Sequence, residues 1–150
     1  MTGIDVRVRT FIDRHRIARL ATADGQGHPS VIPICYAFQN DVFYSVIDEK
    51  PKKLPAVRLR RIQNIRCNPN VALVIDDYSE DWHSLAYVHV RGRAEIIESD
   101  AGEEHAGAVE ALRDRYVQYR SMKIDAQPII KLVPESVYFW QAEAPPAPSP

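Results

Sequence analysis

Cationic side chains are concentrated in a 17-residue stretch that follows the strand-like run Phe43–Val46. Seven of the chain's 19 lysines and arginines lie there: Lys50, Lys52, Lys53, Arg58, Arg60, Arg61 and Arg66. The formal net charge of the whole chain is −1, so the remaining residues are net acidic. A basic cluster on such a chain predicts a local site for an anion rather than a general affinity for polyanions. We interpret it as a binding site for a small ligand that carries phosphate.

Signatures of hydrolytic, zinc and nucleotide-binding chemistry are missing from the sequence. It has no Ser/His/Asp order, no HExxH, no P-loop and no GxGxxG. Cys35 and Cys67 are the only cysteines and have no metal or redox spacing, so we expect reduced, structural thiols. These absences disfavour hydrolysis, zinc chemistry and a nucleotide-binding α/β fold. We assign no side chain as a catalytic acid or base and predict no metal site.

Membrane and nucleic-acid partners are both disfavoured. The longest apolar run, Val31–Phe38, is far shorter than the roughly 20 residues of a membrane span. The N-terminus carries charges where a signal peptide needs an apolar core, so we expect a cytoplasmic protein. Nucleic-acid binding is disfavoured by the near-neutral charge, by the adjacent acidic loop Asp76–Asp81 and by the lack of aromatic residues among the arginines.

Hydrophobic periodicity and turn residues predict the elements that position the basic segment. We expect helices over 1–16, 56–66 and 100–119, and strands over 17–22, 30–39, 42–46, 71–75, 85–97 and 137–140. Pro55 is suited to a helix start and Asp100 to a helix cap. The first three strands follow one another through short loops, which predicts an antiparallel meander. The strand over 30–39 is apolar on both faces, so both should be covered, and Pro33 should leave a gap in its pairing.

Six strands joined in this way predict a small antiparallel barrel, because closure removes exposed sheet edges. The fold class is therefore mainly β with α elements. We expect one domain over residues 1–143, since 150 residues suffice for one core but not for two of ordinary size. Residues 144–150 form a proline-rich tail that we expect to be disordered.

Several of these segments together resemble a known family. They are Arg16–Thr22, the Gly27-His28-Pro29 turn before an apolar strand containing Pro33, Phe43–Ser45, the lysines, and Leu59–Pro69. Their order and spacing resemble the pyridoxamine 5'-phosphate oxidase-like (PPOX class) flavin and deazaflavin oxidoreductases, over about Phe11 to Trp140. Asp48–Lys53, Asp76–Trp82 and the ending at Trp140 are most similar to the group that uses the 8-hydroxy-5-deazaflavin coenzyme F420.

The resemblance implies a six-stranded split β-barrel that forms a homodimer, with a cofactor in each of two grooves between the subunits. It also implies site residues. The tricyclic ring would be flanked by Pro33, Ile34 and Cys35, the polyol chain by Tyr44, Ser45 and Val46, and the phosphate by Lys50, Lys52 and Lys53. Arg61 and Asn64 would lie near the ligand, and Tyr78 and Trp82 would reach the partner's groove.

The function that follows is an F420-dependent oxidoreductase that passes hydride to an unidentified small organic substrate. Two alternatives remain open: an FMN-dependent oxidoreductase of the same fold, and a non-catalytic protein that carries a flavin or a tetrapyrrole. A pyridoxamine-phosphate oxidase activity is disfavoured, because the Tyr138–Trp140 ending lacks the arginine-containing segment that holds the substrate phosphate in that enzyme.

Overall fold

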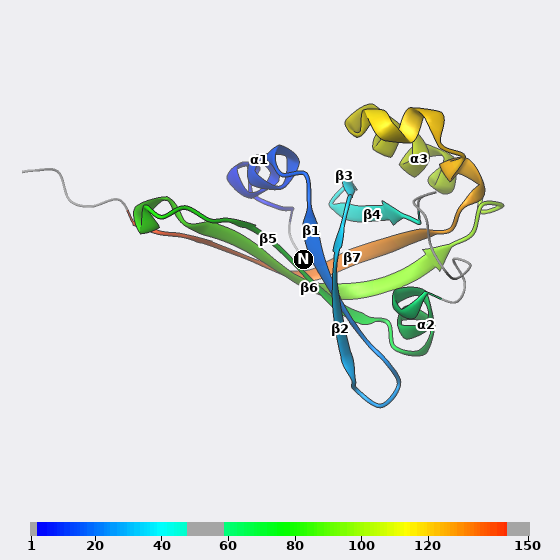
Figure 1. Ribbon diagram of the computed structural model, residues 1–150, viewed down its shortest axis with the longest axis horizontal. Coiled ribbons are helices and arrows are strands. Elements are labelled where there is room, and N and C mark those ends of the chain that lie inside the picture. The colour runs from blue at the N-terminus through cyan, green and yellow to red at the C-terminus, as the bar shows by residue number, and fades with distance from the viewer. Residues whose placement is uncertain (1–2, 48–58, 144–150) are drawn as a thin grey trace, which may run out of the picture.

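A single antiparallel sheet, curled into a half-barrel, organises the computed structural model (Figure 1). The structure describes residues 3–47 and 59–143, so Lys50, Lys52, Lys53, Arg58 and the predicted tail at 144–150 lie outside the described residues. The strands are β1 (Ala18–Ala23), β2 (Pro29–Ile34), β3 (Ala37–Gln39), β4 (Val42–Val46), β5 (Asn70–Asp77), β6 (Ala86–Ile97) and β7 (Ile129–Gln141). The helices are α1 (Val6–Arg14), α2 (Arg60–Cys67) and α3 (Glu103–Arg115), with short 3-10 turns η2 (Trp82–Ser84), η3 (Val117–Ser121) and η4 (Ile124–Ala126).

The order of the strands explains the curl. Neighbours run β2-β1-β5-β6-β7-β4-β3, so β2 and β3 are the two edges of the sheet. Only Cys35 and Tyr36 separate these strands in the chain. Because two residues link opposite edges, the sheet must bend until those edges approach each other. The predicted barrel class is confirmed, with seven strands among the described residues instead of six.

The predicted three-strand meander is wrong, because the expected strand over 30–39 is divided into β2 and β3. Pairing continues through Pro33, opposite Arg19, and stops after Ile34. At the break, the Tyr36 N–H donates to the phenol oxygen of Tyr116 at 3.1 Å. That phenol also lies 3.0 Å from the Tyr36 carbonyl oxygen and 2.7 Å from that of Arg16. The Tyr116 side chain therefore provides hydrogen-bond partners to the Tyr36 backbone, a role that a neighbouring strand has elsewhere in the sheet.

The carboxyl end of α1 is joined to the same corner. The Tyr36 hydroxyl donates to the carbonyl oxygens of Ile12 at 2.5 Å and His15 at 3.0 Å. The Arg115 guanidinium donates to the Asp13 carbonyl at 2.8 Å and to the His15 carbonyl. The last carbonyls of a helix have no partner within the helix and favour a cation. Arg115, at the end of α3, thus caps α1.

Two apolar cores flank the curled sheet. The barrel interior is filled by residues such as Leu20, Tyr36, Phe43, Leu73 and Val90. The second core lies beneath α3, which packs against β3 and β4 (Figure 1), and is built around Leu112, Tyr119, Ile124 and Ile129. α1 packs against β3 and β6, and α2 against β1 and β6. No described helix is long and apolar enough to cross a membrane.

β7 is much longer than the predicted strand over 137–140. It pairs with β6 from Ile129 to Gln141, with an irregularity between Arg91 and Gly92 opposite Pro134. A Cβ atom at Gly92 would overlap the carbonyl oxygen of Val133, so the irregularity requires glycine there. Pro134 concealed this strand from the sequence pattern, because proline inside a run argues against a paired strand.

The helix boundaries differ from those predicted, since α1 begins at Val6 within the expected helix over 1–16. Asp5 caps α1 by accepting from the Arg7 N–H at 2.7 Å. α2 begins at Arg60, since Leu59 is extended, and the predicted helix start at Pro55 lies outside the described residues. The predicted cap Asp100 is not used: α3 begins at Glu103 after Gly102, whose φ is 77°.

The Tyr116→Phe substitution is expected to destabilise the protein by about 1–3 kcal/mol, because it leaves the buried Tyr36 N–H without its acceptor. The measurement is urea unfolding at one fixed protein concentration. Tyr138→Phe removes a hydroxyl from an exposed tyrosine and should stay within about 0.5 kcal/mol of the original protein. Equal effects of the two substitutions would contradict the proposed role of Tyr116.

Candidate functional site

β4 leads directly to the basic segment that the sequence singled out. Tyr44, Ser45 and Val46 are all buried on this strand. Tyr44 and Val46 belong to the core beneath α3, and Ser45 alternates with them toward the barrel interior. Ile47 follows β4 and is the last described residue before the gap. The lysines predicted to bind phosphate, Lys50, Lys52 and Lys53, lie outside the described residues.

Tyr44 is held by a charged cluster that the sequence did not reveal. Its hydroxyl donates to Glu104 Oε2 at 2.8 Å, and Lys131 Nζ lies 2.8 Å from the same oxygen. Tyr44 and Lys131 are direct partners across β4 and β7, and Glu104 reaches them from the first turn of α3. Burial, followed by the Glu104 hydrogen bond, raises the pKa of Tyr44 to about 12. The phenol is therefore a neutral donor directed toward α3.

α2 carries two predicted ligand residues, Arg61 and Asn64, and the side chain of Asn64 is hydrogen-bonded inside the protein. Asn64 is buried, and its Nδ2 donates to Thr22 Oγ1 of β1 at 3.0 Å. Arg61 is half-buried in the first turn, which contains no acidic residue, and the N-cap Leu59 offers no side-chain acceptor. The amino end of α2 is thus cationic, and the described chain resumes there within the basic segment.

The end of β2 places the predicted ring-binding residues in three environments. Pro33 is exposed on an edge strand, Ile34 is buried in the barrel, and Cys35 is half-buried beside a cavity of about 350 Å³. An edge strand leaves part of its backbone hydrogen-bonding groups without sheet partners. Val31, also on β2, is 62% exposed, so one face of this strand is uncovered in the single chain.

Tyr78 and Trp82 lie far from the other predicted site residues of the same chain. The ends of β5, β6 and β7 project beyond the barrel, and η2 forms the tip of this arm (Figure 1). Tyr78 follows β5, Trp82 is in η2, and each is 68% exposed. Within one chain the structure therefore does not bring them to β4 or β2.

A row of outward aromatic residues on the arm was missed as a candidate site. The Tyr87 ring lies 5.6 Å from that of Trp140, nearly parallel, and 6.1 Å from that of Tyr138. Tyr138 is 55% exposed. The sequence contains a sign of this row, since Tyr87 on β6 and Tyr138 and Trp140 on β7 occupy alternate positions of their strands, on the side that faces outward. Only the pairing of β6 with β7 shows that they form one row.

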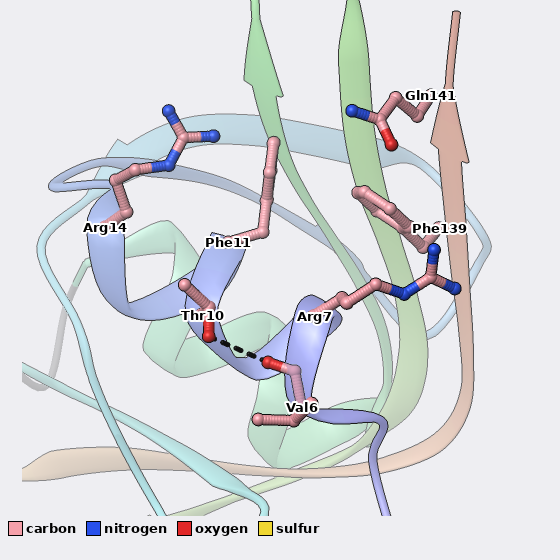
Figure 2. Close-up of a pocket in the computed structure, with 7 residues that line it drawn as sticks. All are labelled: Val6, Arg7, Thr10, Phe11, Arg14, Phe139 and Gln141. Atoms are coloured by element: carbon pink, nitrogen blue, oxygen red, sulfur yellow. Dashed lines mark hydrogen bonds between the residues drawn. The ribbon is translucent and has the colours of Figure 1, made fainter. Parts of the chain in front are cut away.

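A second unpredicted feature is a hollow of about 330 Å³ between α1 and β7 (Figure 2). Phe11 and Phe139 form its apolar floor, with ring centroids 5.4 Å apart. Arg7 and Arg14 stand at its sides in Figure 2. Arg14 Nη2 is 3.2 Å from Asp77 Oδ2. The lining holds no thiol, carboxylate, histidine or lysine, and its hydroxyl, Thr10 Oγ1, donates to the Val6 carbonyl at 2.8 Å. The hollow therefore offers binding contacts rather than a catalytic group.

The family model described as pyridoxamine 5'-phosphate oxidase matches residues 4–141. The chain belongs to the pyridoxamine 5'-phosphate oxidase family. A search by sequence among curated proteins finds no match. The family resemblance that the motifs carried is thus confirmed, and it extends from α1 to the end of β7.

Solved structures share the fold of this family member. Rv2991 of Mycobacterium tuberculosis, a conserved hypothetical protein, is 17% identical with a TM-score of 0.75, covering 94% of this chain and 86% of its own. The heme storage protein HutZ of Vibrio cholerae is 16% identical with a TM-score of 0.69, covering 91% and 94%. A protein named F420 reductase is 21% identical with a TM-score of 0.62, covering 87% and 94%. At such identities these likenesses establish the fold alone.

The Glu104→Gln substitution is expected to destabilise the protein at neutral pH and to have less effect in acid. Hydrogen bonds from Lys131 and then Tyr44 lower the pKa of Glu104 below its ordinary value of 4.5. Its charge therefore stabilises the fold above about pH 4.5, and this contribution is lost as pH falls through the lowered pKa. Because the side chain is 42% exposed, the effect should not exceed about 1 kcal/mol.

Urea unfolding of the original protein and of Glu104→Gln between pH 3 and 7 measures this difference, with Glu103→Gln as the control. Glu103 is exposed in the same helical turn. A difference that does not change with pH would contradict the prediction.

Proposed function

We propose that this member of the pyridoxamine 5'-phosphate oxidase family is an F420-dependent oxidoreductase. In this proposal a homodimer holds the deazaflavin and passes hydride between it and a small organic substrate. The observation that carries the proposal is the family match over residues 4–141, combined with a β4 strand that leads into the basic segment. The F420-type motifs at Asp48–Lys53 and Asp76–Trp82 favour the deazaflavin within this family.

The donor set fits a cofactor with a phosphate and an extended polyol. Lys50, Lys52 and Lys53 would hold the phosphate by charge-assisted hydrogen bonds, next in sequence to the acid-free first turn of α2. β4 would follow the polyol, with Ser45 contributing through its backbone because its side chain is buried toward the barrel interior. Since the Tyr44 hydroxyl bonds Glu104, Tyr44 would contribute through its backbone or ring.

The remaining residues would orient the ring and keep water away from it. Pro33, Ile34 and Cys35 stand where β2 leaves the sheet, and an edge strand can offer backbone groups to ring heteroatoms. Such a cofactor supplies the hydride chemistry when bound, and the protein supplies binding, orientation and exclusion of water. This division of labour agrees with the absence of a hydrolytic or metal-binding motif in the sequence.

A second copy of the chain would complete each groove. Val31 on β2 and Tyr138 and Trp140 on β7 are exposed apolar side chains of the single chain. Contact with a partner would bury them, as stable association requires. The projecting tip with Tyr78 and Trp82 is suited to reach another subunit, because it extends beyond its own barrel (Figure 1).

FMN is the alternative cofactor, since one phosphate site can serve both groups. A parallel fluorescence titration of the purified protein with F420 and with FMN distinguishes them. We expect tight binding of F420 and weak binding of FMN. The reverse order would make the protein a flavin enzyme, and binding of neither would reject both oxidoreductase assignments and direct attention to tetrapyrroles.

Replacement of Lys50 and Lys52 by alanine should weaken cofactor binding by about 1–3 kcal/mol, because charge-assisted bonds to phosphate would be lost. The measurement is the same fluorescence titration. A double variant of Arg7 and Lys123 to alanine removes two charges elsewhere and should leave the affinity unchanged. Unchanged affinity in the Lys50 and Lys52 variant would reject the phosphate assignment.

A further inference from the structure

A cavity of about 350 Å³ opens where β2 ends, within the roughly 300–1,000 Å³ range of small-molecule sites. Three chain segments form it. Arg16 and Ile17 precede β1, Cys35 follows β2, and Tyr116, Tyr119 and Met122 come from the segment after α3. Because Ala18 pairs with Ile34, the next residues outward, Ile17 and Cys35, are neighbours.

Most of the cavity wall is apolar. Ile17, the thiol of Cys35 and the thioether of Met122 face it with partly exposed side chains, and the tyrosine rings behind them are buried. The hydroxyl of Tyr116 bonds the Tyr36 backbone, so this residue presents its ring to the cavity rather than a polar group. A flat apolar molecule would find complementary contacts here.

The charge at the cavity is positive. Arg16 lies with its guanidinium carbon 4.6 Å from the Tyr116 ring centre and donates to the Arg115 carbonyl. Arg115 in turn lies over the Tyr36 and Tyr116 rings. The residues that line the cavity include no carboxylate. An exposed guanidinium beside apolar walls recognises a single carboxylate or sulfonate on an otherwise apolar molecule.

We propose that this cavity binds a small, flat, apolar molecule that carries one anionic group. Its place in the reaction rests on the proposed function: Cys35 borders both the cavity and the expected position of the deazaflavin ring. The cavity would then hold the organic acceptor next to the ring edge. The substrate class is accordingly an unsaturated apolar carboxylate or sulfonate, with Arg16 as the residue that selects for the anion.

Two fluorescent probes of similar shape test the binding site without any cofactor. 8-Anilinonaphthalene-1-sulfonate carries the anion, and N-phenyl-1-naphthylamine lacks it. We expect the Kd of the sulfonate to rise about tenfold in Arg16→Gln, the loss of about one charged hydrogen bond. The affinity for the neutral probe should not change. Arg19→Gln is the matched control, because Arg19 is exposed on β1 and pairs with Asp76. An equal effect of both arginine variants, or no effect of either, would overturn the role of Arg16.

The two cysteines of the chain report where the probe binds. Cys35 lines the cavity, whereas Cys67 is exposed at the end of α2. Bound sulfonate should slow alkylation of Cys35 by N-ethylmaleimide, read by peptide mass spectrometry, and leave Cys67 unaffected. Met122→Trp, which fills the cavity, should abolish this protection. Equal slowing at both cysteines, or none at Cys35, would reject the site.

The acceptor role is tested separately on the F420-loaded protein. We expect the sulfonate to bind with F420 in place, and Met122→Trp to keep the F420 affinity within about twofold. Displacement of the probe by F420 would show that the cavity belongs to the cofactor and would overturn the acceptor assignment. Failure of F420 to bind, with the probe still protecting Cys35, would reject the proposed cofactor while leaving the binding site standing.

Discussion

The fold depends on how the backbone of Tyr36 is satisfied at the corner of the sheet. A buried N–H and carbonyl that leave a strand ladder must find other partners, or they cost free energy comparable to a lost hydrogen bond. Here the phenol of Tyr116 meets both groups, and the Tyr36 hydroxyl meets the end of α1. This exchange lets one continuous chain segment form both edges of the sheet.

The same corner relates the two candidate sites to each other. Tyr116 supports the break after β2 on one side and presents its ring to the cavity on the other. From the break, β3 turns directly into β4, the strand that leads to the basic segment. A change that moves α3 would therefore affect the cavity through Tyr116 and β4 through Glu104. The end of β2, the cavity and β4 are thus all connected to α3 and the residue that follows it.

Prediction from sequence succeeded where local pattern and tertiary environment agree. The strand predicted over 85–97 is β6. The short loop predicted after the first strand is also present, and there Asp24 accepts from the His28 N–H at 2.9 Å. Prediction failed where residues distant in sequence determine a strand boundary or a side-chain contact. Pro134 concealed β7 because its tolerance depends on the irregularity at Gly92, and the split at Tyr36 depends on a phenol 80 residues away. The Glu104–Lys131 contact could not be predicted for the same reason.

By itself, the sequence determined the family, the barrel class and the segment that carries the cationic charge, because these follow from residue types and from short spacings. The tertiary structure decided which residues share a site. In the folded chain, Trp82 lies at the tip of the arm, away from β4, and Asn64 is hydrogen-bonded to Thr22. Arg16, Cys35 and Met122 line one cavity. Such groupings arise when side chains compete for burial and for hydrogen-bond partners in three dimensions, and no local pattern records the outcome of that competition.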